Sequence, residues 1–379
     1  LPGVVTCSML GTANTMSCLA EALGMSLPGC GLAHAVSAKK RRIAKQSGRR
    51  IVEMVKEDLT PRRIMTREAL RNGIKVSMAM GASTNSTLHL PAIAYEGGID
   101  LSLNDFDELS REVPYLCNIK PSGRYPLSVL EECGGVPAVM KAIECKLDLN
   151  QMTVTGKTVG ENLADVELVE NDVIFPMEHP KRPEGGLAIL HGNLAPNGAV
   201  VKQAGVKPSM HYFKGRARVF TSMEDASYAV SNDQIHKGDV LVIRYEGPKG
   251  GPGMREMHMT CSLIVGRGMD EDCALITDGR FSGSTRGPCI GHISPEAAAG
   301  GPIAAVEEGD EIIIDIPNRT LTLCVPDEEI QRRLQTVKHI RKPATPALAR
   351  YAALVTSADQ GAVLKLPEET EQGDILQRN

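Results

Sequence analysis

The spacing of apolar residues changes near residues 180–186, which read Pro-Lys-Arg-Pro-Glu-Gly-Gly. Before this stretch apolar residues recur mostly at helical spacing, and after it short apolar runs of strand length dominate. The prolines and glycines interrupt both patterns and predict a linker. We therefore expect an α/β protein, with a helix-rich α/β first domain over residues 1–183 and a mostly β, barrel-like second domain over residues 184–379.

The first part contains several segments with helical periodicity. Residues 12–23 have apolar side chains at helical spacing, and Gly24 is placed to end that helix. Asn104 with Asp107 resembles a cap for another short helix. One short strand is predicted at 75–78. Further helices are predicted over residues 34–58, 88–95 and 125–145.

The second part is dominated by strand-like runs. Two helices interrupt them, at 223–231 and 327–337. The run 311–316 turns through Pro-Asn-Arg into 320–325, which is a hairpin pattern. The other strands are predicted at 187–190, 199–202, 217–220, 239–244 and 274–277.

Composition restricts the function classes. The 379 residues exceed one ordinary domain of about 150 residues. A net charge of -4 requires no large basic surface, so nucleic acid and anionic membranes are disfavoured as partners. No apolar run approaches the ~18 residues of a membrane-spanning helix. With 3% aromatic residues and no Trp, the core must be built from aliphatic side chains and methionine.

The ten cysteines form no CxxC pair and no dense cluster. This spacing predicts reduced, mostly buried thiols rather than a disulfide scaffold. A metal centre that uses cysteine would have to gather ligands from distant segments. The chain opens Leu-Pro-Gly without an initiator Met, so we expect that an N-terminal portion is missing.

Three loops place reactive side chains among small residues. In residues 7–16, Cys7 precedes a helix, where the macrodipole favours a thiolate; a structural thiol is the alternative. Residues 246–256 lack the GxGxxG and Walker spacings of nucleotide loops, and we interpret them as a sharp turn that presents Glu256. Residues 275–287 run from an apolar strand into a turn around Ser282. The Gly-x-Ser-x-Gly pattern of hydrolases is absent there, and a plain polar turn is the alternative.

These loops resemble one known family. Residues 275–285, Leu-Ile-Thr-Asp-Gly-Arg-Phe-Ser-Gly-Ser-Thr, look like the second signature of the dihydroxy-acid/6-phosphogluconate dehydratases. Other stretches that agree with the family are residues 7–16, 21–29, 81–85 with His89, 247–256, 291–298 and 350–353. The likeness covers essentially the whole chain. Thr-Asp-Gly-Arg-Phe-Ser-Gly resembles the dihydroxy-acid branch, whereas Cys-Ser-Met-Leu-Gly at 7–11 is nearer the sugar-acid dehydratases.

The resemblance implies a hydro-lyase of branched-chain amino-acid biosynthesis. It would convert a 2,3-dihydroxy acid of the 2,3-dihydroxyisovalerate type into a 2-keto acid, with a sugar acid such as an aldonate or 6-phosphogluconate as the alternative substrate. The cofactors would be Mg²⁺ and an iron–sulfur cluster, 2Fe–2S rather than 4Fe–4S. Cys7 matches a cluster ligand, Glu256 a metal ligand and Ser282 the proton acceptor, while Ser284 and Thr12 would bind substrate.

Several expectations follow from the resemblance. Residues 1–183 would be the C-terminal part of the cluster-binding domain, and Cys7, Glu256 and Ser282 would meet in one cleft between the domains. The family's Cys-Asp-Lys segment does not occur here, so we expect the chain alone to lack cluster and Mg²⁺ and to be inactive. A cytoplasmic homodimer or higher homo-oligomer is expected. A non-catalytic binding or assembly module is the alternative outside enzymes.

Overall fold

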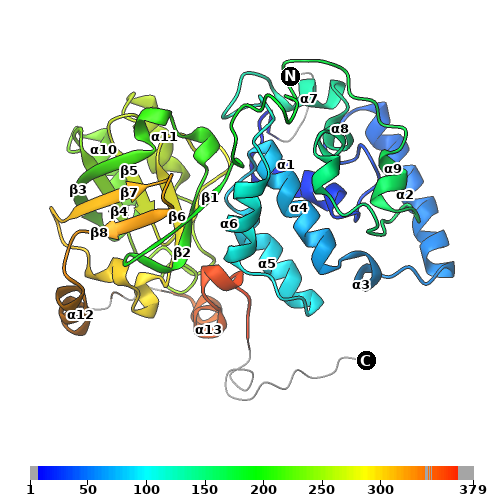
Figure 1. The fold of residues 1–379 in the computed structure, drawn as a ribbon. Coiled ribbons are helices and arrows are strands. Elements are labelled where there is room, and N and C mark those ends of the chain that lie inside the picture. The colour runs from blue at the N-terminus through cyan, green and yellow to red at the C-terminus, as the bar shows by residue number, and fades with distance from the viewer. Residues whose placement is uncertain (1–6, 338–339, 341, 343, 366–379) are drawn as a thin grey trace.

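The computed structural model describes residues 7–337, 340, 342 and 344–365. Helices form one half of the molecule and a barrel of strands forms the other (Figure 1). The helices of the first half are α1 Thr12–Ala22, α2 Ala38–Lys56, α3 Pro61–Ile64, α4 Arg67–Met80, α5 Ser86–Gly97, α6 Leu103–Glu112, α7 Leu127–Glu132, α8 Gly135–Ala142 and α9 Val159–Leu163.

Local capping explains where the central helix α4 begins and ends. The Thr66 hydroxyl accepts a hydrogen bond from the amide of Ala69, and Gly81 closes the helix at φ 64°. The predicted strand at 75–78 is wrong, because these residues lie inside α4. A four-residue alternation is too short to outweigh a helix with a cap at each end. The predicted cap of α6 is also wrong, since Ser102 and Asp105 form the capping box.

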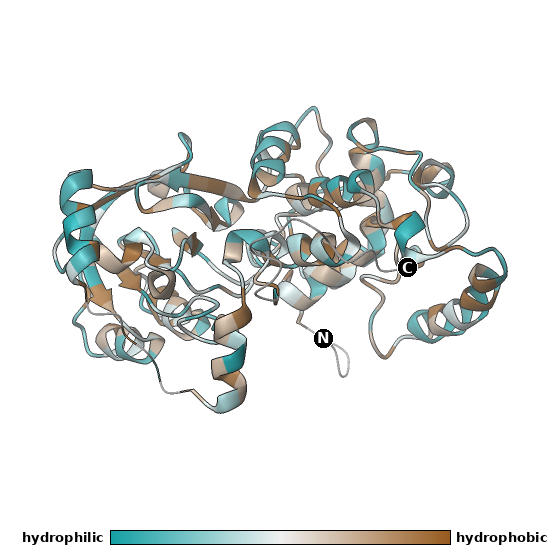
Figure 2. Cartoon of the chain, turned by 90° about the horizontal axis from the view of Figure 1, so that it is seen from below, coloured by the Kyte–Doolittle hydropathy of each residue, from teal (hydrophilic) through white to brown (hydrophobic). Residues whose placement is uncertain are grey.

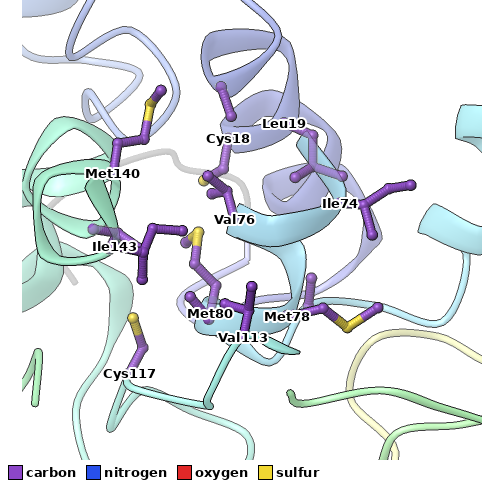
Figure 3. Packing of buried hydrophobic residues seen from close by; sticks show 14 of the residues in the cluster. Cys18, Leu19, Ile74, Val76, Met78, Met80, Val113, Cys117, Met140 and Ile143 are labelled. Atoms are coloured by element: carbon purple, nitrogen blue, oxygen red, sulfur yellow. The ribbon is translucent and has the colours of Figure 1, made fainter. Parts of the chain in front are cut away.

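The helical half buries an aliphatic and sulfur-rich core, as the composition predicted (Figure 3). Cys18, Cys117 and Met78 are all fully buried there, together with the aromatic rings of Phe106 and Tyr115. Flexible methionines fill irregular space between helices, and free thiols pack as small apolar groups. No disulfide joins any of the ten cysteines, all of which lie in the described part of the chain.

The second half is a closed eight-stranded barrel, which confirms the barrel-like prediction. Its strands adjoin in the order β1-β2-β6-β5-β4-β3-β7-β8. Their bounds are β1 Ala188–Gly192, β2 Ala195–Val201, β3 Tyr212–Phe220, β4 Asp239–Ile243, β5 Ala274–Thr277, β6 Cys289–Ser294, β7 Glu311–Asp315 and β8 Thr320–Leu323.

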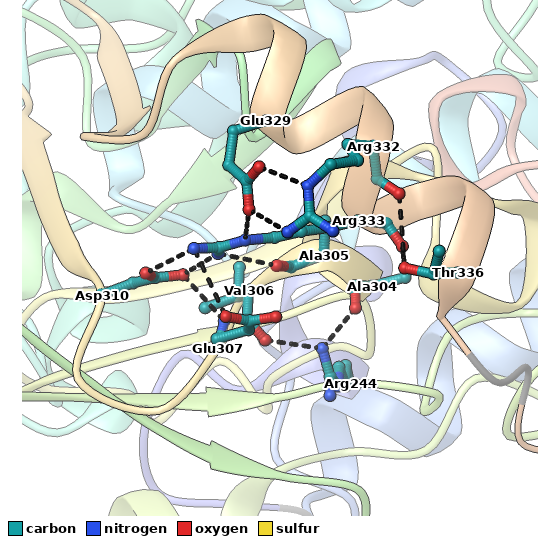
Figure 4. A network of polar contacts seen from close by, with 10 residues as sticks. All are labelled: Arg244, Ala304, Ala305, Val306, Glu307, Asp310, Glu329, Arg332, Arg333 and Thr336. Carbon is teal, nitrogen blue, oxygen red and sulfur yellow. Dashed lines mark hydrogen bonds and ion pairs between the residues drawn. The ribbon is translucent and has the colours of Figure 1, made fainter.

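One strand and two α-helices of the second half escaped prediction: β6, α11 His258–Gly266 and α13 Pro346–Leu354. Strand β6 contains Gly291 and a left-handed His292 at φ 56°, which obscure a strand pattern. The predicted helices α10 Met223–Ser231 and α12 Asp327–Thr336 are present. Arg333 fastens α12 to the barrel through Asp310 at 2.6 Å, and Glu329 of the same helix lies 3.0 Å from the Arg333 guanidinium (Figure 4).

Strands β3, β4, β5 and β6 run parallel to one another. Ile243, the last residue of β4, is in register with Thr277, the last residue of β5. The loops that follow these two strands therefore leave the same end of the barrel. This arrangement places residues 244–257 beside residues 278–288, and both loops carry predicted site residues.

The stretch 180–186 connects the halves but is bonded to the first one. The amide of Gly186 donates to the carbonyl of Met78 at 2.9 Å, and a Cβ on Gly186 would lie 2.2 Å from Gly81 Cα. Near the end of the described chain, a Cβ on Gly361 would lie 2.7 Å from the amide of Ala92 in α5. Two backbone segments, the stretch 180–186 and the one that contains Gly361, thus hold the halves together. The halves lie side by side in Figures 1 and 2.

Candidate functional site

A buried carboxylate fixes the start of both loops at the end of the barrel. Asp278 follows β5 and is fully buried. Its side chain accepts hydrogen bonds from the amides of Tyr245 at 3.0 Å, Glu246 at 2.9 Å and Ala297 at 2.9 Å. Burial raises the pKa of Asp278, and these three donors act in the opposite direction. The aspartate of the signature motif therefore has a structural task.

A second buried carboxylate holds the glycine-rich loop. Glu296 accepts from the amides of Lys249 and Gly250, both at 2.8 Å. Burial raises the pKa of Glu296 to about 7. A Cβ on Gly250 would lie 2.9 Å from the backbone of Tyr245, so this close turn requires glycine. Because a carboxylate occupies these amides, the structure gives no support to an anion-binding loop here.

Glu256 lies beside the signature turn. It forms a parallel bridge with Arg280, and their side chains approach to 3.7 Å. The Glu256 side chain is 36% exposed. His89 from α5 adjoins this pair: burial, then the charge of Arg280, lower its pKa, while Glu256 raises it. A carboxylate, a guanidinium and an imidazole from three segments therefore gather at this place.

Ser282 lies two residues beyond Arg280 and is half-buried. Its hydroxyl is 3.1 Å from the hydroxyl of Ser284, which is 3.3 Å from Nδ1 of His258. The structure thus joins two of the predicted residues and adds His258, which sequence reasoning missed. His258 follows Glu256 by two residues at the start of α11, and that proximity was the only signal. Ser282 makes no hydrogen bond to Glu256 in the described part of the chain, and the meeting of the two residues in one cleft stays a prediction.

The helical half contacts the same turn through an amide side chain. Asn85 Nδ2 donates to Thr12 Oγ1 and to the carbonyl of Phe281, both at 2.8 Å. Asn85 is fully buried, and Thr12 also lies 3.0 Å from the Ser83 hydroxyl. Asn85 lies in the stretch 81–85 that resembles the family, but nothing in the sequence indicated that it joins Thr12 to the signature turn.

The backbones of the two halves also touch. A Cβ on Gly283 would lie 2.8 Å from the Leu10 carbonyl and 2.9 Å from Gly11 Cα. Cys7 begins this same loop, and a Cβ on Gly11 would be 3.9 Å from its Sγ. The loop that carries Cys7 and the turn that carries Ser282 are therefore neighbours, although about 270 residues separate them.

Cys7 is exposed and lines a pocket of about 310 Å³, together with His34, Lys40 and Glu131. Asn14 Nδ2 donates to the Cys7 carbonyl at 2.7 Å and thereby ties the loop to the start of α1. Over residues 7–337, 340, 342 and 344–365, no three His, Cys, Asp or Glu side chains gather as a metal site. Cys7 and Glu256 are each suited to be a single ligand, and neither has the partners of a complete site within this part of the chain.

No helix among the described residues is both long and apolar enough to span a bilayer.

Comparisons with known proteins identify the same family that the sequence motifs resemble. The N-terminal model of the dihydroxy-acid/6-phosphogluconate dehydratases matches residues 1–162, and the C-terminal model matches residues 172–362.

Individual relatives cover nearly the whole chain. Dihydroxy-acid dehydratase of Methanosarcina barkeri is 54% identical over 366 residues, which are 96% of this chain and 66% of the relative. The proteins of the same name from Methanothermobacter thermautotrophicus and Acetivibrio thermocellus are 54% and 53% identical over the same shares of each chain. The chain thus spans about two thirds of the length of these relatives. It belongs to the dihydroxy-acid/6-phosphogluconate dehydratase family.

Proposed function

We propose that the complete polypeptide carrying this sequence is a hydro-lyase that converts 2,3-dihydroxyisovalerate or a close analogue into a 2-keto acid, in branched-chain amino-acid biosynthesis. The observation that carries this proposal is the junction of the Ser282 turn with the Thr12 loop through Asn85. High identity to proteins named dihydroxy-acid dehydratase supports the substrate class. The non-catalytic module lacks a comparable supporting observation.

The proposed chemistry removes a proton and a hydroxide from neighbouring carbons. The Ser282 hydroxyl, as its alkoxide, accepts the proton from C2 of the acid, the C3–O bond breaks, and the resulting enol becomes the 2-keto acid. The proton and the hydroxide together make the water that is released. Ser284 and Thr12 would bind substrate oxygens, since both present hydroxyls beside the turn.

We further propose Mg²⁺ and an iron–sulfur cluster, 2Fe–2S rather than 4Fe–4S, as cofactors of the complete polypeptide. Glu256 would be one ligand of Mg²⁺ and Cys7 one ligand of the cluster, with the remaining ligands supplied from outside the described residues. When bound, these groups would supply Lewis acidity toward the leaving hydroxyl and the developing negative charge. Inactivity and absence of metal in the chain alone remain predictions.

The organisation of the protein is likewise proposed. We place the domain boundary at 183/184, within the stretch that packs on α4, and expect a homodimer or higher homo-oligomer. The ten free thiols favour a reducing, cytoplasmic compartment.

An assay of the complete polypeptide tests the substrate. Formation of 2-keto acid from 2,3-dihydroxyisovalerate is compared with that from an aldonate, at matched concentrations. We expect higher kcat/KM with the former. A clear preference for the aldonate would reassign the enzyme to the sugar-acid branch that the residues 7–11 resemble.

The Cys7→Ser variant tests the cluster assignment. Loss of a thiolate ligand should remove the cluster's visible absorbance together with activity. Cys145→Ser is the matched control, because Cys145 is also exposed but lies far from the loop in sequence. Cys7→Ser protein that retains full absorbance would show that Cys7 is not a ligand.

A further inference from the structure

A buried lysine lies directly against the turn that carries Ser282. Lys202 follows strand β2, and only 2% of its surface is exposed. Its ammonium donates to the carbonyl of Gly283 at 2.8 Å. Gly283 separates Ser282 from Ser284, so this contact fixes the peptide between the proposed base and its hydroxyl partner.

Residues that follow Lys202 in the chain contact the same turn. The amide of Gly287 donates to the carbonyl of Gly205 at 3.1 Å. A Cβ on Gly205 would lie 2.9 Å from the Thr285 carbonyl, so these two backbone segments are in close contact. Residues 202–205 therefore pack against residues 283–287, and Lys202 is the charged residue of that segment.

The lysine is costly as a purely structural residue. Burial lowers the pKa of Lys202 to about 7, because an ammonium loses its hydration there. Within the described residues no carboxylate pairs with it, and its ammonium donates to one backbone carbonyl. An apolar side chain of similar length would fill this position without that desolvation cost. A role of Lys202 in holding the Ser282 turn would offset this desolvation cost.

We propose that Lys202 is a positioning residue for the dehydration. It holds the Gly283 carbonyl so that the Ser282 hydroxyl faces the substrate. Its positive charge also favours the alkoxide form of Ser282. This inference rests on the proposed function. Displacement of a reacting group by about 1 Å can cost ~10²-fold in rate, so one anchoring contact is sufficient to matter.

The test uses the complete polypeptide with three variants. Lys202→Met removes charge and donor, Lys202→Gln keeps a neutral donor, and Lys237→Met is the control because the Lys237 side chain is 84% exposed. For each we measure kcat, KM and amide hydrogen exchange of residues 282–289 against strand β4. We expect Lys202→Met to lower kcat about 10- to 100-fold with KM within about twofold.

Hydrogen exchange separates positioning from general stability. In Lys202→Met, exchange should accelerate about tenfold in residues 282–289 and stay unchanged in β4, and Lys202→Gln should recover part of kcat. A kcat within about twofold of the parent would overturn the proposal, as would unchanged exchange in the turn or uniform acceleration through the barrel. If the parent itself shows no dehydration, the proposed function fails, while local exchange still reports whether Lys202 holds the turn.

Discussion

The two halves hold the site by different means. On the barrel side, buried carboxylates bind the loop amides: Asp278 binds three and Glu296 binds two. On the helical side, the amide side chains of Asn14 and Asn85 bind loop carbonyls and a hydroxyl. Charged acceptors make stronger hydrogen bonds than neutral groups, so the barrel supplies the more firmly fixed part of the site.

The largest effect is expected from Asp278→Asn. The amide replaces one acceptor by a donor that faces backbone N–H groups, so unpaired buried donors remain. We expect the free energy of unfolding to fall by about 2–5 kcal/mol in urea titrations. Asp233→Asn is the control, because that side chain is 79% exposed and should change stability by less than ~0.5 kcal/mol. Equal effects of the two substitutions would contradict the structural task assigned to Asp278 on the barrel side.

The second prediction concerns the contact between the Gly283 turn of the barrel half and the Leu10–Gly11 backbone of the helical half. In Gly283→Ala the new methyl group would meet the Leu10 and Gly11 backbone, which cannot rotate away as a side chain can. We expect a loss of about 1–3 kcal/mol in stability, with impaired turnover. Gly266→Ala in α11 is the matched control, since a Cβ there meets nothing within 4 Å. That variant should gain up to ~1 kcal/mol by helix propensity. If Gly283→Ala matched it, the two loops would not be in contact.

The third prediction is a pH dependence in the barrel. Burial, with the charges of Arg280 and His89, lowers the pKa of His292 to about 3. Because the unfolded imidazole titrates near 6.5, the unfolded state binds more protons between pH 6.5 and 3. The contribution of His292 to stability is therefore complete above pH 6.5 and is lost as the pH falls toward 3, at up to ~1.4 kcal/mol per pH unit.

A variant isolates this contribution from other titrating groups. His292→Asn suits the left-handed backbone at φ 56°. Urea unfolding at pH 7 and pH 5 should show a smaller loss on acidification for the variant than for the parent. Glu296 titrates with the opposite sign between its ordinary value and about 7, but it is present in both proteins. Identical pH dependence in both proteins would contradict the assignment to His292.

The sequence predicted elements whose signals are local. Helix α1 and strand β5 follow from apolar spacing, and the β7–β8 hairpin follows from its turn residues. Strand β6 escaped because Gly291 and the left-handed His292 interrupt it. The 75–78 segment misled because the choice between strand and helix depended on caps at Thr66 and Gly81, which lie outside that window.

The features of the site also divide into those that the sequence indicated and those that it did not. Loops of small residues first indicated Cys7, Glu256 and Ser282, the family resemblance supplied their roles, and those roles remain predictions. Contacts across long sequence separations, such as Asn85 with Phe281 or Lys202 with Gly283, leave no periodic pattern in the chain. They arise from the strand order of the barrel and from the contact between the two halves, and neither is encoded in any single segment.

The most direct test of the account is turnover of Ser282→Ala in the complete polypeptide, measured as 2-keto acid formed from 2,3-dihydroxyisovalerate. Iron, sulfide and magnesium contents are determined on the same samples. The account predicts unchanged metal content and a kcat lower by at least ~10²-fold, because a positioned base contributes at least that much. Near-normal turnover with intact metal content would contradict the account and leave Ser282 as a turn residue.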